Sequence, residues 1–584
     1  MPATERMNLA EYCLARAARE RPEATALCFA EQVTGGPAGP QLSVREWSFA
    51  QVEREVLRVV AALRELDARP GDRFLVRLRH SPEFAFAFFG AVAAGLIAVP
   101  ASPLLTAPEI DFLIADARPA FVCRDLALPW PAERALNSSN PATASADGRT
   151  GNPRAGPIPR RLEYRDLTAA GGSHVYAATA AEDPAFLVYT SGTTGRPKGV
   201  LHAQRSAFGR RPMRAGWSGL GPDDRLLHAG QLNWTYSLGV GLMDPWSVGA
   251  AGLLYSADAS DPTVWARLIA ELKATIFAAV PSLYRRILKY TDADALRNLS
   301  TLRHGLTAGE ALVPELHAEW SAATGKALFE ALGMSEVSTY ISSGPEAPTK
   351  PGSPGKPQPG RRIAILRDDP TSDDETDDDD DDDDDPGDSF RIKTGESRAP
   401  VLCAPGEVGL LAVHRDDPGL MLGYWNRPEE EAQVFRGEWF AGGDRAAIDP
   451  DGYVRYLGRR DELMNASGYR VSPIEVERVL AAHPLVNEVA VHEVSPAPGV
   501  RIIAAFVVPV DRALLETSSN QNAAASAQAA LEKDRIATEK RGLLNFAADR
   551  LADYKRPREI YFRATLPRTA NGKIIRQRLA LESE

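Results

Sequence analysis

Short apolar runs alternate with helical patterns along much of the chain. The strand-like runs cover residues 250–254 and 276–280, and apolar residues at helical spacing follow each of them, in residues 262–272 and 281–289. Residues 48–66 show the same helical spacing behind a capping-box pattern. Because strands that alternate with helices build βαβ units, we expect an α/β fold whose sheets are largely covered by helices.

The longest apolar stretch, residues 84–100, is interrupted by Gly90 and Gly95. A helix that crosses a membrane needs about 20 consecutive apolar residues, so we interpret this stretch as a buried helix followed by a strand at residues 96–99. The N-terminus has no basic segment followed by an apolar run, which argues against a secretory signal. We expect no membrane span and a cytoplasmic location.

The pattern changes near residues 458–461, where a turn-rich segment gives way to a compact α+β pattern. At 584 residues the chain is too long for one ordinary core. We therefore expect a large N-terminal domain, residues 1–460, and a small mobile C-terminal α+β domain, residues 461–584. A polar insertion at residues 516–541 is expected to be a loop or an exposed helix.

Within the small domain, Ser472 is the expected cap of a helix that begins at Pro473, and Glu475 completes a capping box. Strands are expected to follow at residues 486–494 and 502–508. This order of elements predicts a small sheet with a helix packed on it.

The net charge of −11 comes from one segment. Residues 371–389 hold 13 acidic residues and no lysine or arginine, and without them the net charge would be +2. An aspartate run repels itself, so we expect a disordered, solvated insertion; calcium binding or a docking role is the alternative. No basic patch indicates nucleic acid. The four cysteines form no CxxC pair, which excludes a typical zinc site and fits a reducing compartment.

The segment YTSGTTGRPKGV, residues 189–200, follows an apolar run and has the composition of a phosphate-binding loop. Its glycines let the backbone approach a ligand, and its hydroxyls and Lys198 can surround phosphate oxygens. The spacing differs from a Walker A loop, and Pro197 argues against a helix at that point. The loop predicts that the protein handles a nucleoside triphosphate, through Thr190, Ser191, Gly192, Thr193, Thr194, Gly195 and Lys198.

Further motifs follow in order: TAGEAL at residues 307–312, LGMSE at 332–336, the long segment GEWFAGGDRAAIDPDGYVRYLGRRDELMNASGYRVSPIEVE at 437–477, and PRTANGKIIR at 567–576. Together with the phosphate loop they resemble the AMP-forming acyl/aryl-CoA synthetases of the adenylate-forming superfamily, which also includes adenylation domains and luciferases. The motifs span nearly the whole chain and are closest in character to the benzoate-type CoA ligases.

The resemblance implies an ATP-dependent carboxylic acid:CoA ligase that uses Mg²⁺. Lys573 matches the lysine that bridges the carboxylate and the α-phosphate, and Glu336 matches the glutamate that binds the metal. With Thr190 they form the expected catalytic set. Lys573 and the metal held by Glu336 would both stabilise charge, since phosphoryl transfer depends mainly on positioning and electrostatics.

The nucleotide itself is expected to contact three further segments. Asp444 and Arg459 match the residues that support the ribose, and an acceptor-only carboxylate suits a diol. Many members of the superfamily have an aromatic residue where this chain has Leu332, so adenine would meet an aliphatic side chain there. The remaining residues that the resemblance assigns to ATP and AMP are Gly309, Glu310, Ala311, Gly333, Met334 and Ser335.

After adenylation the resemblance implies that the small domain rotates about Asp461 and that CoA thiol then attacks the acyl-adenylate. The CoA-binding residues would be Ser467, Gly468, Tyr469 and Arg470. The segment QLNWTYSLGVG, residues 231–241, resembles an acyl-pocket motif, although its aromatic residues could equally belong to the core. Its expected pocket residues are Trp234, Tyr236, Leu238 and Gly239.

We expect the substrate to be an aromatic, cyclic or medium-chain carboxylic acid, with ATP and CoA as the other partners and a monomer or homodimer as the assembly. Two alternatives remain open. One is an enzyme that adenylates an acid and loads a separate carrier protein, and the other is a nucleotide-binding sensor without catalysis.

Overall fold

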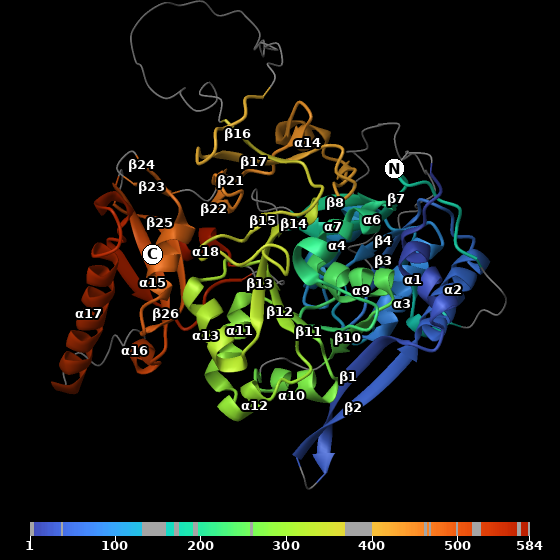
Figure 1. Ribbon diagram of the computed structural model, residues 1–584, viewed down its shortest axis with the longest axis horizontal. Helices are drawn as coiled ribbons and strands as arrows, with labels where there is room; N and C mark the ends of the chain where they lie inside the picture. Colours follow the sequence, from blue (N-terminus) through green and yellow to red (C-terminus); the bar gives the residue numbers. More distant parts are fainter. Residues whose placement is uncertain are drawn as a thin grey trace, which may run out of the picture.

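The computed structural model describes residues 5–36, 39–130, 159–168, 175–190, 197–256, 261–367, 400–460, 464–466, 469–497, 500–516, 527–568 and 574–581. These residues form a mixed α/β structure with a large N-terminal part and a small C-terminal part at one side of it (Figure 1). The fold class expected from the sequence is confirmed. The acidic segment 371–389 lies outside the described residues.

The first sheet has seven strands in the order β18-β8-β7-β4-β3-β5-β6. The strands β7, β4, β3, β5 and β6 run parallel, whereas β8 returns antiparallel to β7 and pairs with β18. Their bounds are β3 Arg73–Arg77, β4 Ile97–Pro100, β5 Phe121–Arg124, β6 Arg160–Leu162, β7 Pro184–Thr190, β8 Lys198–Ala203 and β18 Gly423–Tyr424.

The second sheet has nine strands in the order β15-β14-β13-β12-β11-β9-β10-β1-β2. Its centre, from β13 to β1, is parallel, and antiparallel strands close both edges. The bounds are β1 Thr25–Gly36, β2 Gly39–Ser48, β9 Arg225–His228, β10 Ala251–Tyr255, β11 Ile276–Ala279, β12 His304–Ala308, β13 Ala327–Met334, β14 Ser338–Ser342 and β15 Lys356–Pro357.

Helices cover these sheets as the βαβ pattern predicts. One buried cluster joins α1, α2 and α3 to strands of both sheets, and a second joins α10 to α13 to the other face of the second sheet. The bounds are α1 Leu9–Glu20, α2 Phe49–Glu65, α3 Pro82–Ala93, α4 Ala107–Ala117, α6 Ser206–Gly209, α7 Arg211–Met213, α8 Thr235–Leu238, α9 Asp244–Val248, α10 Val264–Glu271, α11 Pro281–Tyr290, α12 Ala293–Arg297 and α13 Pro314–Thr324.

The structure explains two features of the sequence, the capping box at Ser48 and the glycine at position 90. The predicted helix at residues 48–66 is α2, and Ser48 and Gln51 make both hydrogen bonds of the capping box. Gly90 of α3 faces α2, where a Cβ atom would lie 2.4 Å from the Cβ of Val59. Glycine is therefore required there, because the two helices approach each other too closely for a larger residue.

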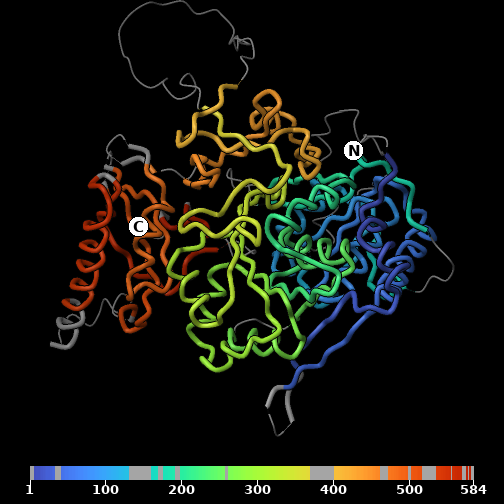
Figure 2. Tube along the Cα trace, in the orientation of Figure 1, coloured from blue at the N-terminus to red at the C-terminus, as the bar shows by residue number. Residues whose placement is uncertain are grey.

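A third, mainly antiparallel sheet lies above the first two in Figure 2, in the order β19-β20-β17-β21-β22, with β16 paired to β17. It carries the segment that leads into the C-terminal part. The bounds are β16 Ile363–Leu366, β17 Gly409–His414, α14 Pro428–Val434, β19 Phe435–Arg436, β20 Trp439–Phe440, β21 Asp444–Ile448 and β22 Val454–Arg459.

The C-terminal part has its own buried core, built around the sheet β25-β26-β27. The predicted strands at residues 486–494 and 502–508 are β25 and β26. Part of the polar segment 516–541 belongs to the long helix α17. The bounds are β23 Met464–Ala466, β24 Tyr469–Val471, α15 Pro473–Ala481, β25 Val486–Ala497, β26 Val500–Pro509, α16 Ala513–Glu516, α17 Ala527–Ala548, β27 Glu559–Phe562 and α18 Arg576–Leu581.

One detail of the capping prediction is wrong. Ser472 precedes α15 as expected, but its hydroxyl makes no capping hydrogen bond. Glu475 does not complete a capping box either, because its carboxylate accepts hydrogen bonds from Lys555 Nζ at 2.7 and 2.9 Å. The tertiary ion pair replaces the local contact that the sequence predicts.

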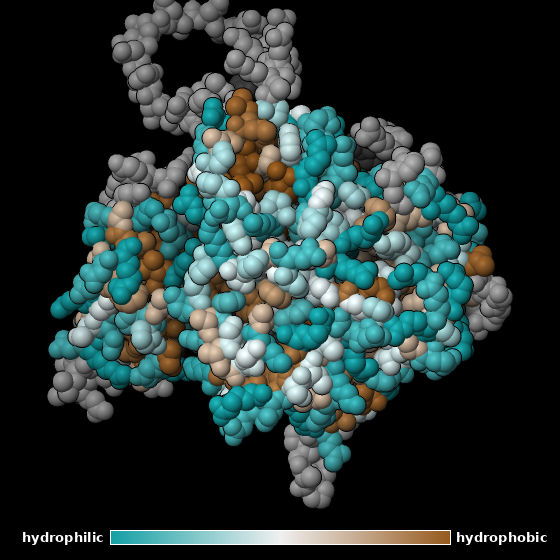
Figure 3. All heavy atoms as spheres, in the orientation of Figure 1, coloured by the Kyte–Doolittle hydropathy of each residue, from teal (hydrophilic) through white to brown (hydrophobic). Residues whose placement is uncertain are grey.

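Polar residues cover most of the face shown in Figure 3, and apolar residues appear there in separate patches. Among the helices that the structure describes, none has the length and apolar character needed to cross a membrane.

Candidate functional site

The predicted phosphate loop joins the antiparallel strands β7 and β8. Thr190 at the end of β7 pairs in register with Lys198 at the start of β8, so the two ends of the loop lie side by side. The ammonium of Lys198 forms an ion pair with Glu430 of α14 and lies 5.6 Å from the ring centre of Tyr424. Ser191, Gly192, Thr193, Thr194 and Gly195 lie outside the described residues.

Tyr424 connects this lysine to the predicted metal ligand. Its hydroxyl donates a 2.7 Å hydrogen bond to Oε1 of Glu336, which lies between β13 and β14. Burial and the nearby Glu336 carboxylate raise the pKa of Tyr424, so the phenol stays protonated and acts as the donor. The sequence analysis missed Tyr424; the signal available was an aromatic residue ahead of three consecutive glutamates, in GYWNRPEEE.

Glu336 fits the role of a magnesium ligand. Within the described part of the chain no group of three or more His, Cys, Asp or Glu side chains could hold a metal by itself. Magnesium needs less than that, because it commonly keeps several waters and binds one or two carboxylates together with substrate phosphates. The Tyr424 hydroxyl occupies Oε1 of Glu336 and orients the carboxylate.

The two residues expected at the ribose are direct neighbours. Asp444 of β21 pairs in register with Arg459 of β22, and Oδ1 of Asp444 accepts a 3.0 Å hydrogen bond from the Tyr456 hydroxyl. Asp444 is 6% exposed. Tyr340 of β14 is fully buried nearby, and its pKa is raised by burial and by the fields of Asp444 and Glu336. Asp444 and Glu336, the residues expected at the ribose and at the metal, therefore both lie near Tyr340.

In the segment expected at the adenine, residues 309–311, the backbone is exposed at Gly309 and Ala311. Gly309 has a φ of +90°. The Glu310 carboxylate is fixed by Ser282, which donates two hydrogen bonds to it, one from its backbone N at 3.0 Å and one from its hydroxyl at 3.1 Å. Leu332 and Met334 are half-buried on β13. Gly333 between them has no room for a Cβ, since the carbonyl of Ser338 would lie 2.6 Å away.

The residues of the expected acyl pocket take different positions. Trp234 lies against Gly309, with its ring 3.0 Å from where a Cβ would be, and its ring meets that of Tyr236 edge to face at 5.1 Å. Tyr236 points into a buried cluster and stacks on Trp217 at 6.0 Å. Trp234 thus links the acyl motif to the adenine segment, while Tyr236 supports it from the core.

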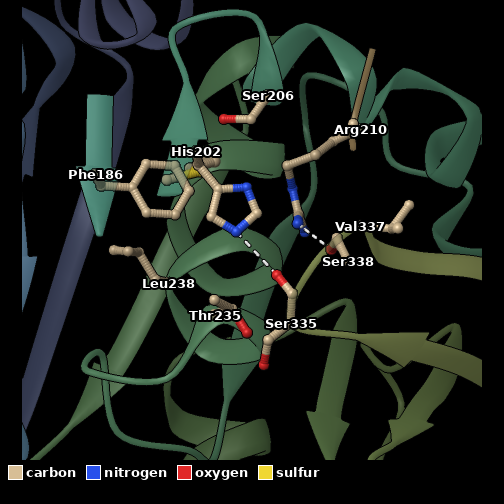
Figure 4. A pocket seen from close by; sticks show the side chains of 11 residues that line it. Phe186, His202, Ser206, Arg210, Thr235, Leu238, Ser335, Val337 and Ser338 are labelled. Atoms are coloured by element: carbon tan, nitrogen blue, oxygen red, sulfur yellow. Dashed lines mark hydrogen bonds between the residues drawn. The ribbon is translucent and has the colours of Figure 1, made fainter. Parts of the chain in front are cut away.

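Leu238 lines a cavity between the first and second sheets (Figure 4). The volume of this cavity is about 20 Å³, which is small. The His202 ring stacks on Phe186 and donates from Nε2 to the carbonyl oxygen of Ser335 at 2.9 Å. Burial lowers the pKa of His202 to about 4, so it is neutral near pH 7.

Arg210 lines the same cavity and forms two 2.7 Å hydrogen bonds to the Asp244 carboxylate. It also donates to Ser338 (Figure 4). Gly239 faces this guanidinium, and a Cβ there would lie 2.3 Å from its central carbon. Gly239 therefore leaves room for the Arg210 side chain. Through Ser338, Arg210 contacts the start of β14, the strand that follows the LGMSE motif.

Several predicted residues of the C-terminal part, Lys573, Asp461, Ser467 and Gly468, lie outside the described residues. Tyr469 and Arg470 belong to β24, which pairs with β23. Near Lys573, the described residues Arg568 and Ile574 form a β-bridge, and Arg568 Nη1 lies 3.4 Å from Glu310 Oε1. The C-terminal part therefore contacts the adenine segment.

The order of these motifs and their convergence around Glu336, Asp444 and Gly309 agree with a family comparison. The pattern of the AMP-binding enzyme family matches residues 14–380, and that of the AMP-binding enzyme C-terminal domain matches residues 475–573. The chain belongs to the AMP-binding enzyme family. It is an AMP-forming acyl-CoA synthetase, which joins a carboxylic acid to CoA through an acyl-adenylate.

Similar proteins match the chain over more than nine-tenths of its length. A benzoate–CoA ligase of Thauera aromatica is 30% identical over an alignment of 545 positions, which covers 91% of this chain and 90% of that protein. A 3-hydroxybenzoate–CoA ligase of Aromatoleum is 29% identical, over 94% of this chain and 96% of that protein. The crystal structure of the anthranilate CoA ligase AuaEII with anthranoyl-AMP is 28% identical and superposes with a TM-score of 0.77, over 100% of this chain and 98% of that chain.

Proposed function

We propose that this synthetase activates an aromatic or cyclic carboxylic acid, with medium-chain acids as weaker substrates. The observation that carries the proposal is the Trp234 ring, which lies against Gly309 at the edge of the adenine segment. The Trp234 ring packs directly on this glycine and is half-buried, and an apolar aromatic surface of this kind packs well against a ring-shaped acid. The similarity to ligases named for benzoate, 3-hydroxybenzoate and anthranilate supports the same class.

In the first step an oxygen of the carboxylate attacks the α-phosphorus of ATP, and the bond to pyrophosphate breaks. Phosphoryl transfer of this kind depends on alignment and on charge stabilisation. We propose that Lys198, with Thr190, Ser191, Gly192, Thr193, Thr194 and Gly195, binds the phosphates. Asp444 and Arg459 would bind the ribose, and Gly309, Glu310, Ala311, Leu332, Gly333, Met334 and Ser335 would border the adenine.

We propose Lys573 as the cation that stabilises charge on the carboxylate and the α-phosphate. Glu336 would hold Mg²⁺, which neutralises phosphate charge when it is bound. In the second step the CoA thiolate attacks the acyl carbon and AMP leaves. We propose Asp461 as the hinge of the small domain. The proposed CoA-binding residues are Ser467, Gly468, Tyr469 and Arg470.

The test is pyrophosphate and AMP release from ATP over a panel of benzoates, cyclohexane carboxylates and fatty acids, with and without CoA. We expect CoA-dependent AMP formation with benzoates or cyclohexane carboxylates. Lys573→Ala should lower the rate by about 100-fold or more, on the scale of lost electrostatic stabilisation. Lys289→Ala removes an exposed lysine of α11 and serves as the matched control.

Preference for fatty acids over every ring acid would contradict the substrate class. Pyrophosphate release that CoA does not accelerate would instead favour a carrier protein as the acceptor. A Lys573→Ala variant with the activity of the control would remove the proposed role of that lysine.

A further inference from the structure

Arg568 of the C-terminal part contacts Glu310 of the TAGEAL segment. It lies in the PRTANGKIIR motif and forms a β-bridge with Ile574, and Ile575 N donates to the Pro567 carbonyl at 2.9 Å. Arg568 and Ile574 therefore lie side by side. Lys573 directly precedes Ile574 in the sequence.

The Arg568 guanidinium connects carboxylates of two different parts of the molecule. Its Nη2 lies 2.8 Å from Oε2 of Glu488, on β25 of the C-terminal sheet. Its Nη1 lies 3.4 Å from Oε1 of Glu310, in the TAGEAL segment of the N-terminal part. All three side chains are about a quarter exposed, at 27%, 28% and 27%.

Glu310 is a fixed target for this arginine. Both of its carboxylate oxygens accept hydrogen bonds from Ser282, at the first turn of α11. By contrast, the other end of the same motif is tied inside the C-terminal part, where Arg576 forms 2.9 and 2.8 Å hydrogen bonds to Glu477 of α15. The motif thus has one anchor in its own part and one across the boundary.

We infer that the Arg568–Glu310 ion pair holds the C-terminal part in the arrangement used for acyl-adenylate formation, and that it separates before the thioester is formed. The inference rests on the proposed role of Lys573. Arg568 acts as a positioning residue, because it touches the loop that borders the adenine and not the reacting atoms. A partly exposed pair is weak, so it can form and break in every catalytic cycle.

The test is a double-mutant cycle of Arg568→Gln, Glu310→Gln and the double variant, measured separately on the two steps. Single-turnover pyrophosphate release reports the first step, and thioester formation from added acyl-adenylate reports the second. We expect each single variant to slow the first step about fivefold, the scale of a partly exposed ion pair, and the double variant to be no slower than either single one. The second step of the Arg568→Gln variant should stay within about twofold of the wild type, and Glu310→Gln is compared on the first step alone because Glu310 also borders the proposed adenine site.

Two further variants keep the result interpretable. Arg568→Lys retains the charge and should recover part of the first-step rate. Glu488→Gln removes the other partner of Arg568 within the C-terminal part and should leave the first step near wild type. Circular dichroism would show that each variant is folded.

Equal slowing of both steps, or effects of the two single variants that multiply in the double variant, would overturn the inference. A Glu488→Gln variant as slow as Arg568→Gln would overturn it as well. Failure of the proposed function has a different result: the wild type would form no AMP with any acid, or Lys573→Ala would retain full first-step activity.

Discussion

At the scale of single residues, the site depends on side chains that hold the predicted ligands in place. Tyr424 orients Glu336, Tyr456 donates to Asp444, and Ser282 fixes Glu310. Tyr456 lies within the long motif at residues 437–477, whereas Tyr424 and Ser282 belong to none of the motifs that the sequence analysis singled out. Each of them donates a hydrogen bond to a carboxylate that we propose for the site, and so fixes its orientation.

Tyr424→Phe tests the most central of these contacts. Loss of the hydroxyl leaves Oε1 of Glu336 without its 2.7 Å hydrogen bond, so we expect kcat/KM for adenylation to fall about 10-fold and the required Mg²⁺ concentration to rise. Steady-state kinetics over a magnesium series would measure both. Tyr453→Phe is the matched control, because its hydroxyl donates to the Pro348 carbonyl at an exposed position. Equal effects in the two variants would contradict the role of Tyr424.

Glu330 gives a prediction for the pH dependence of stability. It is buried on β13 and accepts a 3.0 Å hydrogen bond from Leu312 N, and burial raises its pKa to about 7, from an ordinary value of 4.5. Between these two values the unfolded chain loses this proton while the folded chain keeps it. Stability from this group is therefore complete below about pH 4.5 and falls by roughly 3 kcal/mol as the pH rises through 7.

Glu330→Gln mimics the protonated form and removes this dependence. We expect the variant to be more stable than the wild type at pH 8 and close to it at pH 5, as measured by urea unfolding at both values. Glu315→Gln on α13 is the control, at an exposed position in the first turn of that helix. The same stability difference at both pH values would show that the Glu330 proton does not carry the effect.

At the scale of elements, two helices begin with the same sequence signal and different structures. At α2, Gln51 N donates to the Ser48 hydroxyl at 3.4 Å, and Ser48 N donates to Gln51 Oε1 at 2.8 Å. At α15, the Ser472 hydroxyl makes no capping bond and Glu475 pairs with Lys555 instead. Local sequence therefore decides the first helix start, and a tertiary ion pair decides the second.

We expect Ser48→Ala to destabilise the N-terminal part by about 1 kcal/mol, the usual value of a helix cap. Ser472→Ala should change stability by less than about 0.5 kcal/mol, since it removes no capping bond. Scanning calorimetry of both variants would measure the difference. A larger loss for Ser472→Ala than for Ser48→Ala would contradict the structural assignment of the two caps.

At the scale of the whole molecule, the described residues that flank the acidic segment are paired with each other. Leu366 forms a β-bridge with Leu402, and Arg367 N donates to the Val401 carbonyl at 2.8 Å. The ends therefore lie side by side on the third sheet. Chain can be removed between such ends without straining the sheet, because loop closure depends only weakly on length.

Deletion of residues 371–389 should leave kcat and KM within about twofold of the wild type, while the net charge changes from −11 to +2. Steady-state kinetics and isoelectric focusing would measure these two outcomes. Replacing the same acidic residues with serine and threonine, at unchanged length, separates the effect of charge from that of length. A large loss of activity on deletion would indicate a functional role of the acidic run.

The sequence by itself determined the fold class, the family and the order of the motifs. These depend on local signals: apolar periodicity places α2, α10 and α11, and the glycine and hydroxyl spacing of the phosphate loop is contiguous. The domain boundary, the roles of the site residues, the cytoplasmic location and the oligomeric state stay predictions.

Only the tertiary structure decided which distant residues support the site. Tyr424 and Glu336 are 88 positions apart, and Arg568 and Glu310 are 258 positions apart. No local pattern encodes such pairs, because they form only when the first sheet and the C-terminal part pack against the second sheet. The same packing determines that Trp234 borders Gly309 while Tyr236 lies in the core.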